Sequence, residues 1–227
     1  MTLAPSLFLS LAACSGQNQF TFAGSPVWKL FPFDGERTWE YISTDESLSY
    51  KLVASSILEP EVVRNKNVYT VDYAVECVRT DPECVTGTLL RQLRWSSTVT
   101  DGVLVHGWSV DGGPLADYDP PVRITADMAE RDDVFVTESG GITWISTVLG
   151  VDECPIHMNA AWEECTMFEV AADVDGDGAP DEGEGYPLAG TYWMTQGNGT
   201  AALEIVGDSG QWQLSDLGCE GECDGSW

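Results

Sequence analysis

Positive charge is what this chain of 227 residues has least of. Ten lysines and arginines stand against 37 aspartates and glutamates, which gives a formal net charge of -27 at pH 7. Binding of nucleic acid depends on a basic surface that neutralises phosphates. The shortage therefore excludes nucleic acid as an expected partner and disfavours adhesion to anionic lipid headgroups. Such an acidic surface keeps molecules apart in solution and suits a salty medium, where screening weakens self-repulsion.

Long helical periodicity is also missing. No segment repeats its apolar residues every 3.6 positions over several turns, which argues against parallel strands joined by crossover helices. Residues 125–131 form the one stretch whose pattern predicts a helix, and it is short. The apolar run of residues 3–13 is shorter than the ~20 residues with which a helix crosses a bilayer. The chain is therefore expected to be mainly β.

The alternation of half-buried strands is the dominant pattern that is present. In residues 68–78, Tyr73 and Val75 fall on one face and Asp72 falls on the other. Residues 89–99 repeat this two-residue period, which is the signature of a strand with one buried face. A single β-rich domain over residues 26–227 is expected.

Turn residues separate the strands at short intervals. Residues 100–102, 138–141 and 207–210 all contain glycine and each join two β-rich runs, as hairpin turns do. Successive hairpins predict an antiparallel meander, which forms either a strongly curved sheet or an open barrel. Pro120-Pro121 is expected to interrupt the strands and separate two halves of the sheet.

The N-terminal apolar run ends in Leu11-Ala12-Ala13-Cys14. This ending resembles the lipobox of bacterial lipoproteins. The resemblance implies that residues 1–13 are a signal peptide and that Cys14 becomes a lipidated N-terminus. More than one acyl chain makes membrane anchoring stable, because each buried CH₂ contributes ~0.8 kcal/mol. An ordinary cleaved signal peptide, or a short buried segment with a chance cysteine, are the alternatives.

The residues that follow Cys14 bear on where such a protein would reside. Residues 14–25 are interpreted as the lipidated cysteine and a polar tether. Ser15 follows the cysteine in place of aspartate, and the lipoprotein resemblance then implies the outer membrane or surface of a Gram-negative cell. The expected membrane partner is reached through the lipid anchor.

Six further cysteines fall into three near-neighbour pairs: Cys77 and Cys84, Cys154 and Cys165, Cys219 and Cys223. An even number in a chain with an export signal indicates a disulfide framework. The spacing favours three short-range disulfides, although six cysteines allow other connectivities. A metal site built from Cys154, His157 and Cys165 is the alternative. It is disfavoured because the tight Cys-x₂-Cys pairs of zinc thiolate sites are absent.

Residues 30–41 carry the motif Leu-Phe-Pro-Phe-Asp-Gly-Glu-Arg-Thr-Trp-Glu-Tyr. It resembles the "FPL-x₂-G-x₂-W-x-Y" opening of a loose group of secreted bacterial proteins of unknown function. Those proteins similarly end with an aromatic strand and a Gly-x-Gly step, here residues 192–199. The resemblance implies a shared architecture and names no reaction. Pro32 and Gly35 are expected to form a turn that delivers Trp39 and Tyr41 onto a strand face.

Residues 173–184 are the one constellation that points to a metal. Their carboxylates and glycines follow the order of the twelve-residue EF-hand loop, but the flanking segments are not helical and Pro180 lacks an N–H. The segment is more similar to the isolated calcium loops of thrombospondin type 3 repeats. The resemblance implies Ca²⁺ bound by Asp173, Asp175, Asp177, the Ala179 carbonyl, Asp181 through water, and Glu184. A solvated acidic loop is the alternative.

No catalytic residues can be singled out, and a non-catalytic envelope lipoprotein with a structural or binding role is the leading hypothesis. A carrier of lipid or lipoprotein in the style of half-barrels is the second hypothesis, a sugar- or peptide-binding module the third, and a hydrolase the fourth. A concave face filled by its own aromatics would exclude the carrier. Trp95, Trp144 and Trp212 are expected in the core, His106 is interpreted as a half-exposed structural histidine, and Trp108 shares its face.

Overall fold

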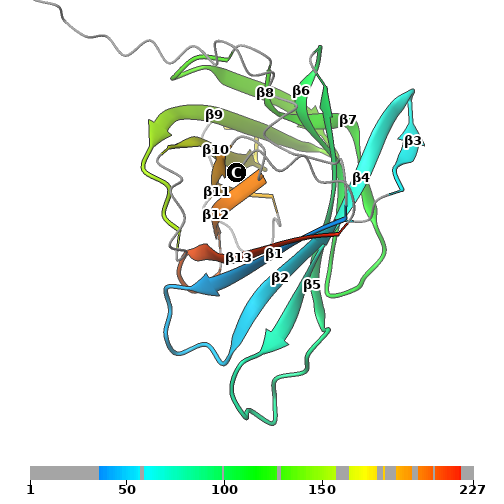
Figure 1. Ribbon diagram of the computed structural model, residues 1–227. Coiled ribbons are helices and arrows are strands. Elements are labelled where there is room, and N and C mark those ends of the chain that lie inside the picture. Colours follow the sequence, from blue (N-terminus) through cyan, green and yellow to red (C-terminus); the bar gives the residue numbers. More distant parts are fainter. Residues whose placement is uncertain are drawn as a thin grey trace, which may run out of the picture.

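The computed structural model describes residues 36–56, 59–98, 100–126, 129–156, 164–177, 181, 188–195, 199–206 and 208–220. Within these residues the secondary structure is β, without a helix (Figure 1). The strands are β1 (Glu36–Ser43), β2 (Tyr50–Ser56), β3 (Glu61–Val63), β4 (Lys66–Cys77), β5 (Leu89–Thr98), β6 (Gly102–Val110), β7 (Ala116–Thr125), β8 (Val134–Ser139), β9 (Ile142–Asp152), β10 (Cys165–Asp173), β11 (Gly190–Thr195), β12 (Gly199–Ile205) and β13 (Trp212–Glu220).

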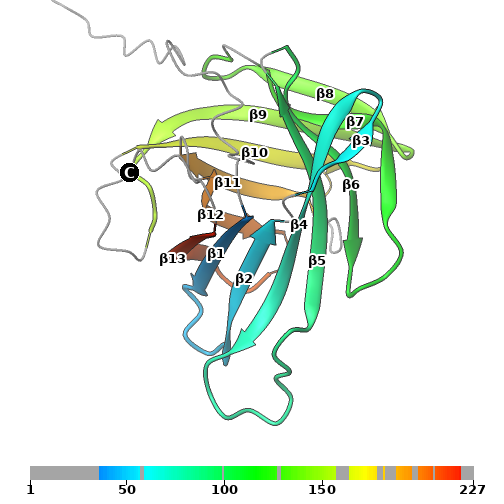
Figure 2. The same ribbon diagram turned by 45° about the vertical axis from the view of Figure 1, so that its right-hand side comes forward.

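One antiparallel sheet curls into a nearly closed barrel. Its strand order is β7-β6-β5-β4-β2-β1-β13-β12-β11-β10-β9-β8, with β3 added beside β4. The first and second halves of the chain therefore each form a meander, and the last strand, β13, pairs with the first, β1 (Figures 1 and 2). The two end strands, β7 and β8, lie against each other where the barrel would close.

The predicted hairpins are confirmed. Residues 100–102 and 138–141 join β5 to β6 and β8 to β9, and residues 208–210 lie between β12 and β13. Gly102 has a φ of +74°, and a Cβ at this position would lie 1.9 Å from the Thr125 carbonyl oxygen. Only glycine fits both the left-handed turn and this close approach of β7.

Aromatic side chains fill the barrel interior. The predicted apolar faces of β4 and β5 are buried, as Val71, Tyr73, Leu93 and Trp95 show, although in β5 the opposite face is partly buried too. Trp39 and Tyr41 lie on the buried face of β1 as expected. They belong to one cluster drawn from both meanders. Its large aromatic members, each at most 2% exposed, are Trp39, Tyr41, Tyr73, Trp95, Trp144, Phe168, Tyr192 and Trp212.

The short helix predicted at residues 125–131 is wrong for the residues that the structure describes there. Thr125 is the last residue of β7 and pairs with Val103, while residues 129–131 are irregular or in a turn. A helix of about two turns does not repay the cost of its nucleation without packing. Pairing with Val103 in the sheet gives Thr125 a more stable conformation than a short helix would.

The expectation that Pro120-Pro121 interrupts the strands is also wrong. Both prolines lie inside β7, between the pairs Gly107 with Asp117 and Val105 with Val122. The register shifts there, so the prolines occupy a bulge in which no ladder N–H is required of them. β7 is also an end strand, where proline is tolerated on the unpaired edge.

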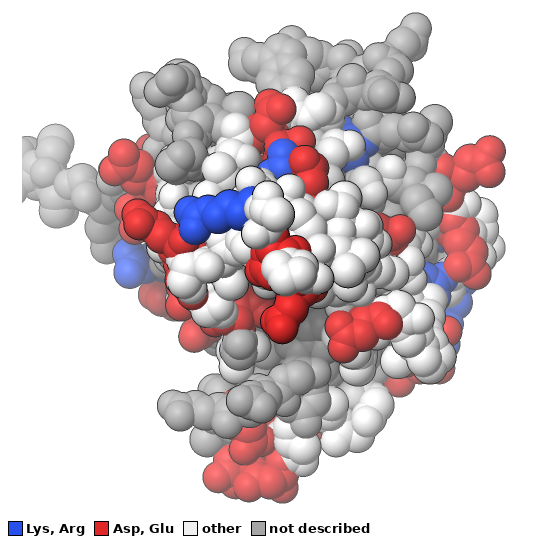
Figure 3. All heavy atoms as spheres, turned by 90° about the horizontal axis from the view of Figure 1, so that it is seen from below, with Lys and Arg blue, Asp and Glu red and all other residues white. Residues whose placement is uncertain are grey.

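Acidic side chains are spread over the molecular surface. On the face that Figure 3 shows, red carboxylate residues are scattered among uncharged ones and outnumber the blue basic residues. On this face the carboxylates are therefore dispersed and are not gathered into one patch.

Candidate functional site

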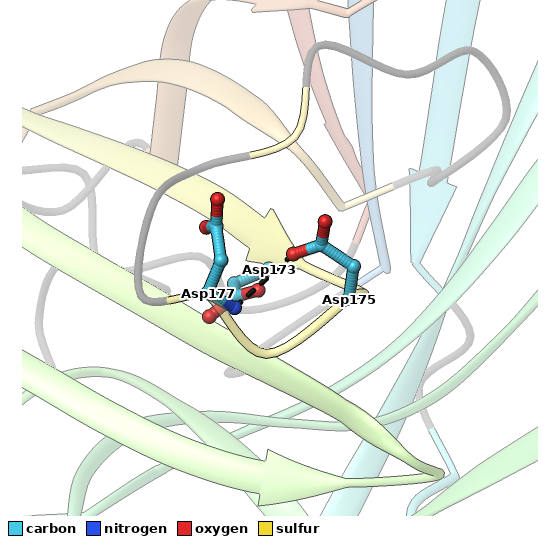
Figure 4. Close-up of side chains that lie close together, drawn as sticks. All are labelled: Asp173, Asp175 and Asp177. Atoms are coloured by element: carbon cyan, nitrogen blue, oxygen red, sulfur yellow. Dashed lines mark hydrogen bonds between the residues drawn. The ribbon is translucent and has the colours of Figure 1, made fainter.

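The acidic loop begins where β10 ends. Asp173 is the last residue of that strand and is 4% exposed, whereas Asp175 and Asp177 are exposed. One carboxylate oxygen from each of the three residues lies within 4.8 Å of the others (Figure 4). The end of β10 therefore places the buried carboxylate of Asp173 beside the exposed carboxylates of Asp175 and Asp177.

Hydrogen bonds within the loop bend it around these carboxylates. The Gly176 N–H donates to Asp173 Oδ1 at 2.7 Å, and the Asp177 N–H donates to Asp175 Oδ1 at 3.1 Å. Gly176 has a φ of +77°, a conformation that glycine adopts without strain. The turn thus brings alternate carboxylates to one side, as a calcium loop requires.

Asp181 closes the described part of this loop. Its N–H donates to the Ala172 carbonyl at 2.8 Å, and its Oδ2 accepts from the Val174 N–H at 2.6 Å. The other two predicted ligands, Ala179 and Glu184, lie outside the described residues. The candidate metal-ligand atoms in the described part of the loop are all carboxylate oxygens. Ca²⁺ prefers oxygen ligands, so this part of the loop fits the ion.

Two of the three predicted disulfides are present. The sulfurs of Cys77 and Cys84 are 2.01 Å apart and those of Cys154 and Cys165 are 2.08 Å apart. The second disulfide joins the segment after β9 to the start of β10, and it makes both sulfurs unavailable to the alternative thiolate metal site. The predicted pair of Cys219 and Cys223, like Cys14, lies outside the residues whose side chains the structure describes.

Arg91 is a buried cation in the barrel that sequence reasoning did not single out. It lies on β5 with the parity of the apolar residues Leu93 and Trp95, and its side chain is 8% exposed. Its Nη2 donates to Asp208 Oδ2 at 2.7 Å, across from the turn between β12 and β13. The position of Arg91 on the same face of the strand as Leu93 and Trp95 was the sequence feature that could have indicated its burial.

Aromatic groups surround the pair of Arg91 and Asp208. The Trp212 indole N–H donates to the same Asp208 oxygen at 3.0 Å, and its ring lies 5.7 Å from that of Tyr50. Burial raises the pKa of Tyr73 to about 12, and the Arg91 guanidinium opposes that rise. The Arg91 guanidinium also opposes the rise in pKa that burial causes at Tyr50 and Tyr192.

A second buried cation, Arg94, lies on the predicted polar side of β5. It is ion-paired with Glu61 of β3 and with Asp117 of β7, the latter at 2.5 Å between Nη1 and Oδ1. Both carboxylates are about 70% exposed, while Arg94 is 6% exposed. The β3–β4 hairpin and the β7 bulge bury this face, which no local pattern in β5 could indicate.

His106 is more deeply buried than predicted, at 4% exposure. Its Nε2 lies 2.7 Å from the Ser96 hydroxyl on the neighbouring strand. Burial first, and then the charges of Lys66, Arg94 and Arg64, lower the pKa of His106 to about 4, against an opposing contribution from Asp117. Ser96 is 1% exposed, so a substrate cannot reach this serine unless the covering strands move.

The tryptophans of the described residues do not form a flat exposed platform. Trp95, Trp144 and Trp212 are buried as predicted, together with Trp39 and Trp193. Trp108 is half-buried and packs against the main core. Stacking of a sugar would need aromatic faces open to solvent, which this arrangement does not offer.

Comparisons with protein-family models, with curated proteins and with solved structures find no match for this chain. Among the described residues, no helix has the length and apolarity needed to cross a bilayer.

Proposed function

We propose that this chain is a lipid-anchored, non-catalytic protein of the bacterial cell envelope with a structural or binding role and one calcium-ordered loop. The anchor is Cys14, after removal of residues 1–13, and the outer membrane or surface of a Gram-negative cell is the proposed location. The resemblance of the N-terminal segment to a lipobox is the sequence basis of this proposal.

The two disulfides support the extracytoplasmic location. Such bonds persist in oxidising compartments and are rare where cytosolic thiol systems keep cysteines reduced. Both bonds staple short loops of a β-domain, at sequence separations of 7 and 11 residues. Stapling of this kind is typical of exported domains.

The filled interior is the observation that favours a structural or binding role over a carrier. A carrier of acyl chains needs an apolar hollow that it opens to its cargo. Here the inward-facing Trp39, Trp95, Trp144 and Tyr192 are at most 1% exposed and pack into one cluster. The same packing argues against sugar binding inside the barrel.

The anchor is tested by fractionation of the producing cells and mass spectrometry of the native N-terminus. We expect the chain in the membrane fraction, beginning at a diacylglyceryl Cys14, and a Cys14→Ala variant that lacks acyl chains. Ser15→Ala is the matched control and should remain lipidated. A chain that keeps residues 1–13 and bears no lipid would contradict the anchor.

The calcium loop is tested by thermal unfolding with and without Ca²⁺. With a Kd on the order of 1 mM, about 10 mM Ca²⁺ should stabilise the protein by about 1.4 kcal/mol. An Asp173→Asn, Asp175→Asn double variant should lose this gain. Asp111→Asn removes one exposed carboxylate from another turn and should keep it. Equal Ca²⁺ responses of the double variant and the wild type would rule out the site.

A further inference from the structure

The barrel has a seam where its two end strands meet. β7 and β8 lie side by side, yet no backbone ladder joins them in the described residues. Side chains of β8 and of β9 instead form hydrogen bonds with the backbone of β7. The Arg123 N–H donates to Thr137 Oγ1 at 3.2 Å, and Ser146 Oγ donates to the Ile124 carbonyl at 2.6 Å. The seam is thus held without the hydrogen bonds that join every other pair of neighbouring strands in the sheet order.

Among the described residues, no strand pairs with the edge of β8 that faces the seam. Because the Val148 N–H donates to the Asp133 carbonyl at 2.9 Å, the odd-numbered residues turn their peptide groups toward β9. Val134, Val136 and Glu138 consequently direct their N–H and C=O groups toward the seam. Unpaired edge groups of this kind are a template for another strand.

A groove of about 790 Å³ runs along this edge (Figure 2 shows β8 and β7 beside each other). Its walls include β8 from Val134 to Glu138 on one side and Leu104, Pro120 and Arg123 on the other. Val134 and Val136 are 53% and 63% exposed. Two exposed valines on the same face of one strand form an apolar surface beside the unpaired edge.

We propose that this seam groove binds an extended basic peptide segment, which adds to β8 as a strand. The unpaired N–H and C=O groups require a partner whose own backbone is extended, and the valines favour apolar residues at alternate positions of it. The inference deepens the binding role proposed above and names its partner class, but it does not depend on calcium or on the lipid anchor.

Charge selects a basic segment over a second copy of this chain. Within the groove Lys66 is paired with Asp101 at 3.0 Å, and Arg123 and Glu138 balance each other, so the lining is neutral overall. The net negative charge of the whole molecule then determines which kind of segment is attracted to the groove. Two copies would each bring 27 negative charges, whereas a basic peptide is attracted. β7 also stands beside the edge of β8 and hinders approach of a whole second barrel.

Fluorescence anisotropy with the full-length protein in EDTA tests the proposal. The probe is a labelled peptide of about eight residues in which valine and lysine alternate. We expect saturable binding and slower hydrogen exchange at the amides of Val134, Val136 and Glu138. A peptide of the same sequence with N-methyl groups at alternate residues keeps the charge but cannot complete the ladder, and it should bind at least about tenfold more weakly.

Matched variants locate the contact. Val134→Lys with Val136→Lys should weaken binding of the valine–lysine peptide at least about tenfold, because charged residues on an edge strand oppose strand addition. Val78→Lys with Val85→Lys changes two similarly exposed valines near the Cys77–Cys84 disulfide and adds the same charge. This control pair should bind as the wild type does.

Three results would overturn the proposal. The first is equal affinity for the N-methylated and unmodified peptides, which would indicate attraction by charge alone. The second is the absence of saturable binding. The third is a wild-type dimer in sedimentation that the Val134→Lys, Val136→Lys variant converts to monomer, since a second copy would then occupy the groove. None of these results bears on lipidation or Ca²⁺ binding, so the two proposals fail separately.

Discussion

Arg91 and Arg94 are three positions apart on β5 and are buried on opposite faces of it. Arg91 points into the barrel and meets one carboxylate, Asp208, whereas Arg94 lies under the outer strands and meets two, Glu61 and Asp117. Burial of an arginine is tolerated when charged partners compensate the loss of hydration. Each arginine thus connects segments that are distant in sequence, and removal of either cation would take these ion pairs from its carboxylate partners.

His106 makes the stability of the protein depend on pH in a defined window. Its pKa falls from 6.5 to about 4 in the folded state. Between these values the unfolded chain binds a proton that the folded chain does not. The stabilising contribution is therefore complete above about pH 6.5 and is lost as the pH falls toward 4.

The expected loss at pH 4 is about 2 kcal/mol, which allows for screening of the neighbouring charges by solvent. It is measured by urea unfolding at a series of pH values. His106→Gln keeps a polar partner for Ser96 but does not titrate, so its stability should vary less across this window. Carboxylates contribute equally to both proteins, and superimposable pH profiles would show that His106 has no such role.

At the scale of elements, the strands were predicted where the two-residue period and the turn residues agree. The β5–β6 and β8–β9 hairpins follow from this agreement. The prediction failed at β7, because the prolines there lie in a bulge, where four residues of β7 stand opposite His106 of β6. It failed again at residues 125–131, where Thr125 pairs in the ladder and residues 129–131 are irregular or in a turn.

The disulfide between Cys154 and Cys165 should stabilise the fold more than the one between Cys77 and Cys84. It closes the longer loop, and its cysteines are 6% and 0% exposed in a small cluster with Trp193. Replacing Cys154 and Cys165 by alanine should cost about 3 kcal/mol or more, and replacing Cys77 and Cys84 about 2.5 kcal/mol or less. Urea unfolding of the two double variants gives the order, and the reverse order would contradict this account.

At the scale of the whole molecule, the excess of acidic residues is a destabilising force that salt relieves. The 27 net negative charges repel one another in the compact state, and the Debye length shortens from about 30 Å at 0.01 M to about 3 Å at 1 M salt. Ion pairs such as Arg64 with Asp119, at 2.7 Å, oppose this repulsion locally. Their exposure makes their contribution small.

We expect NaCl to raise the free energy of unfolding by about 1–3 kcal/mol between about 0.01 and 1 M. Unfolding in EDTA separates this effect from Ca²⁺ binding, and sucrose at matched osmolality serves as the uncharged control. A decrease of stability with NaCl would mean that the ion pairs outweigh the repulsion.

The sequence by itself determined several of the strands, the hairpins that join them, two cysteine pairs and the acidic loop. These features depend on residues close together in the chain, and side-chain alternation, turn conformations and short spacings are all local. The tertiary structure decided the pairing of β1 with β13, the seam between β7 and β8, and the contacts of Arg91 with Asp208 and of His106 with Ser96. Those depend on how the twisted sheet curls and in which register its ends meet, and neither can be read from a local pattern.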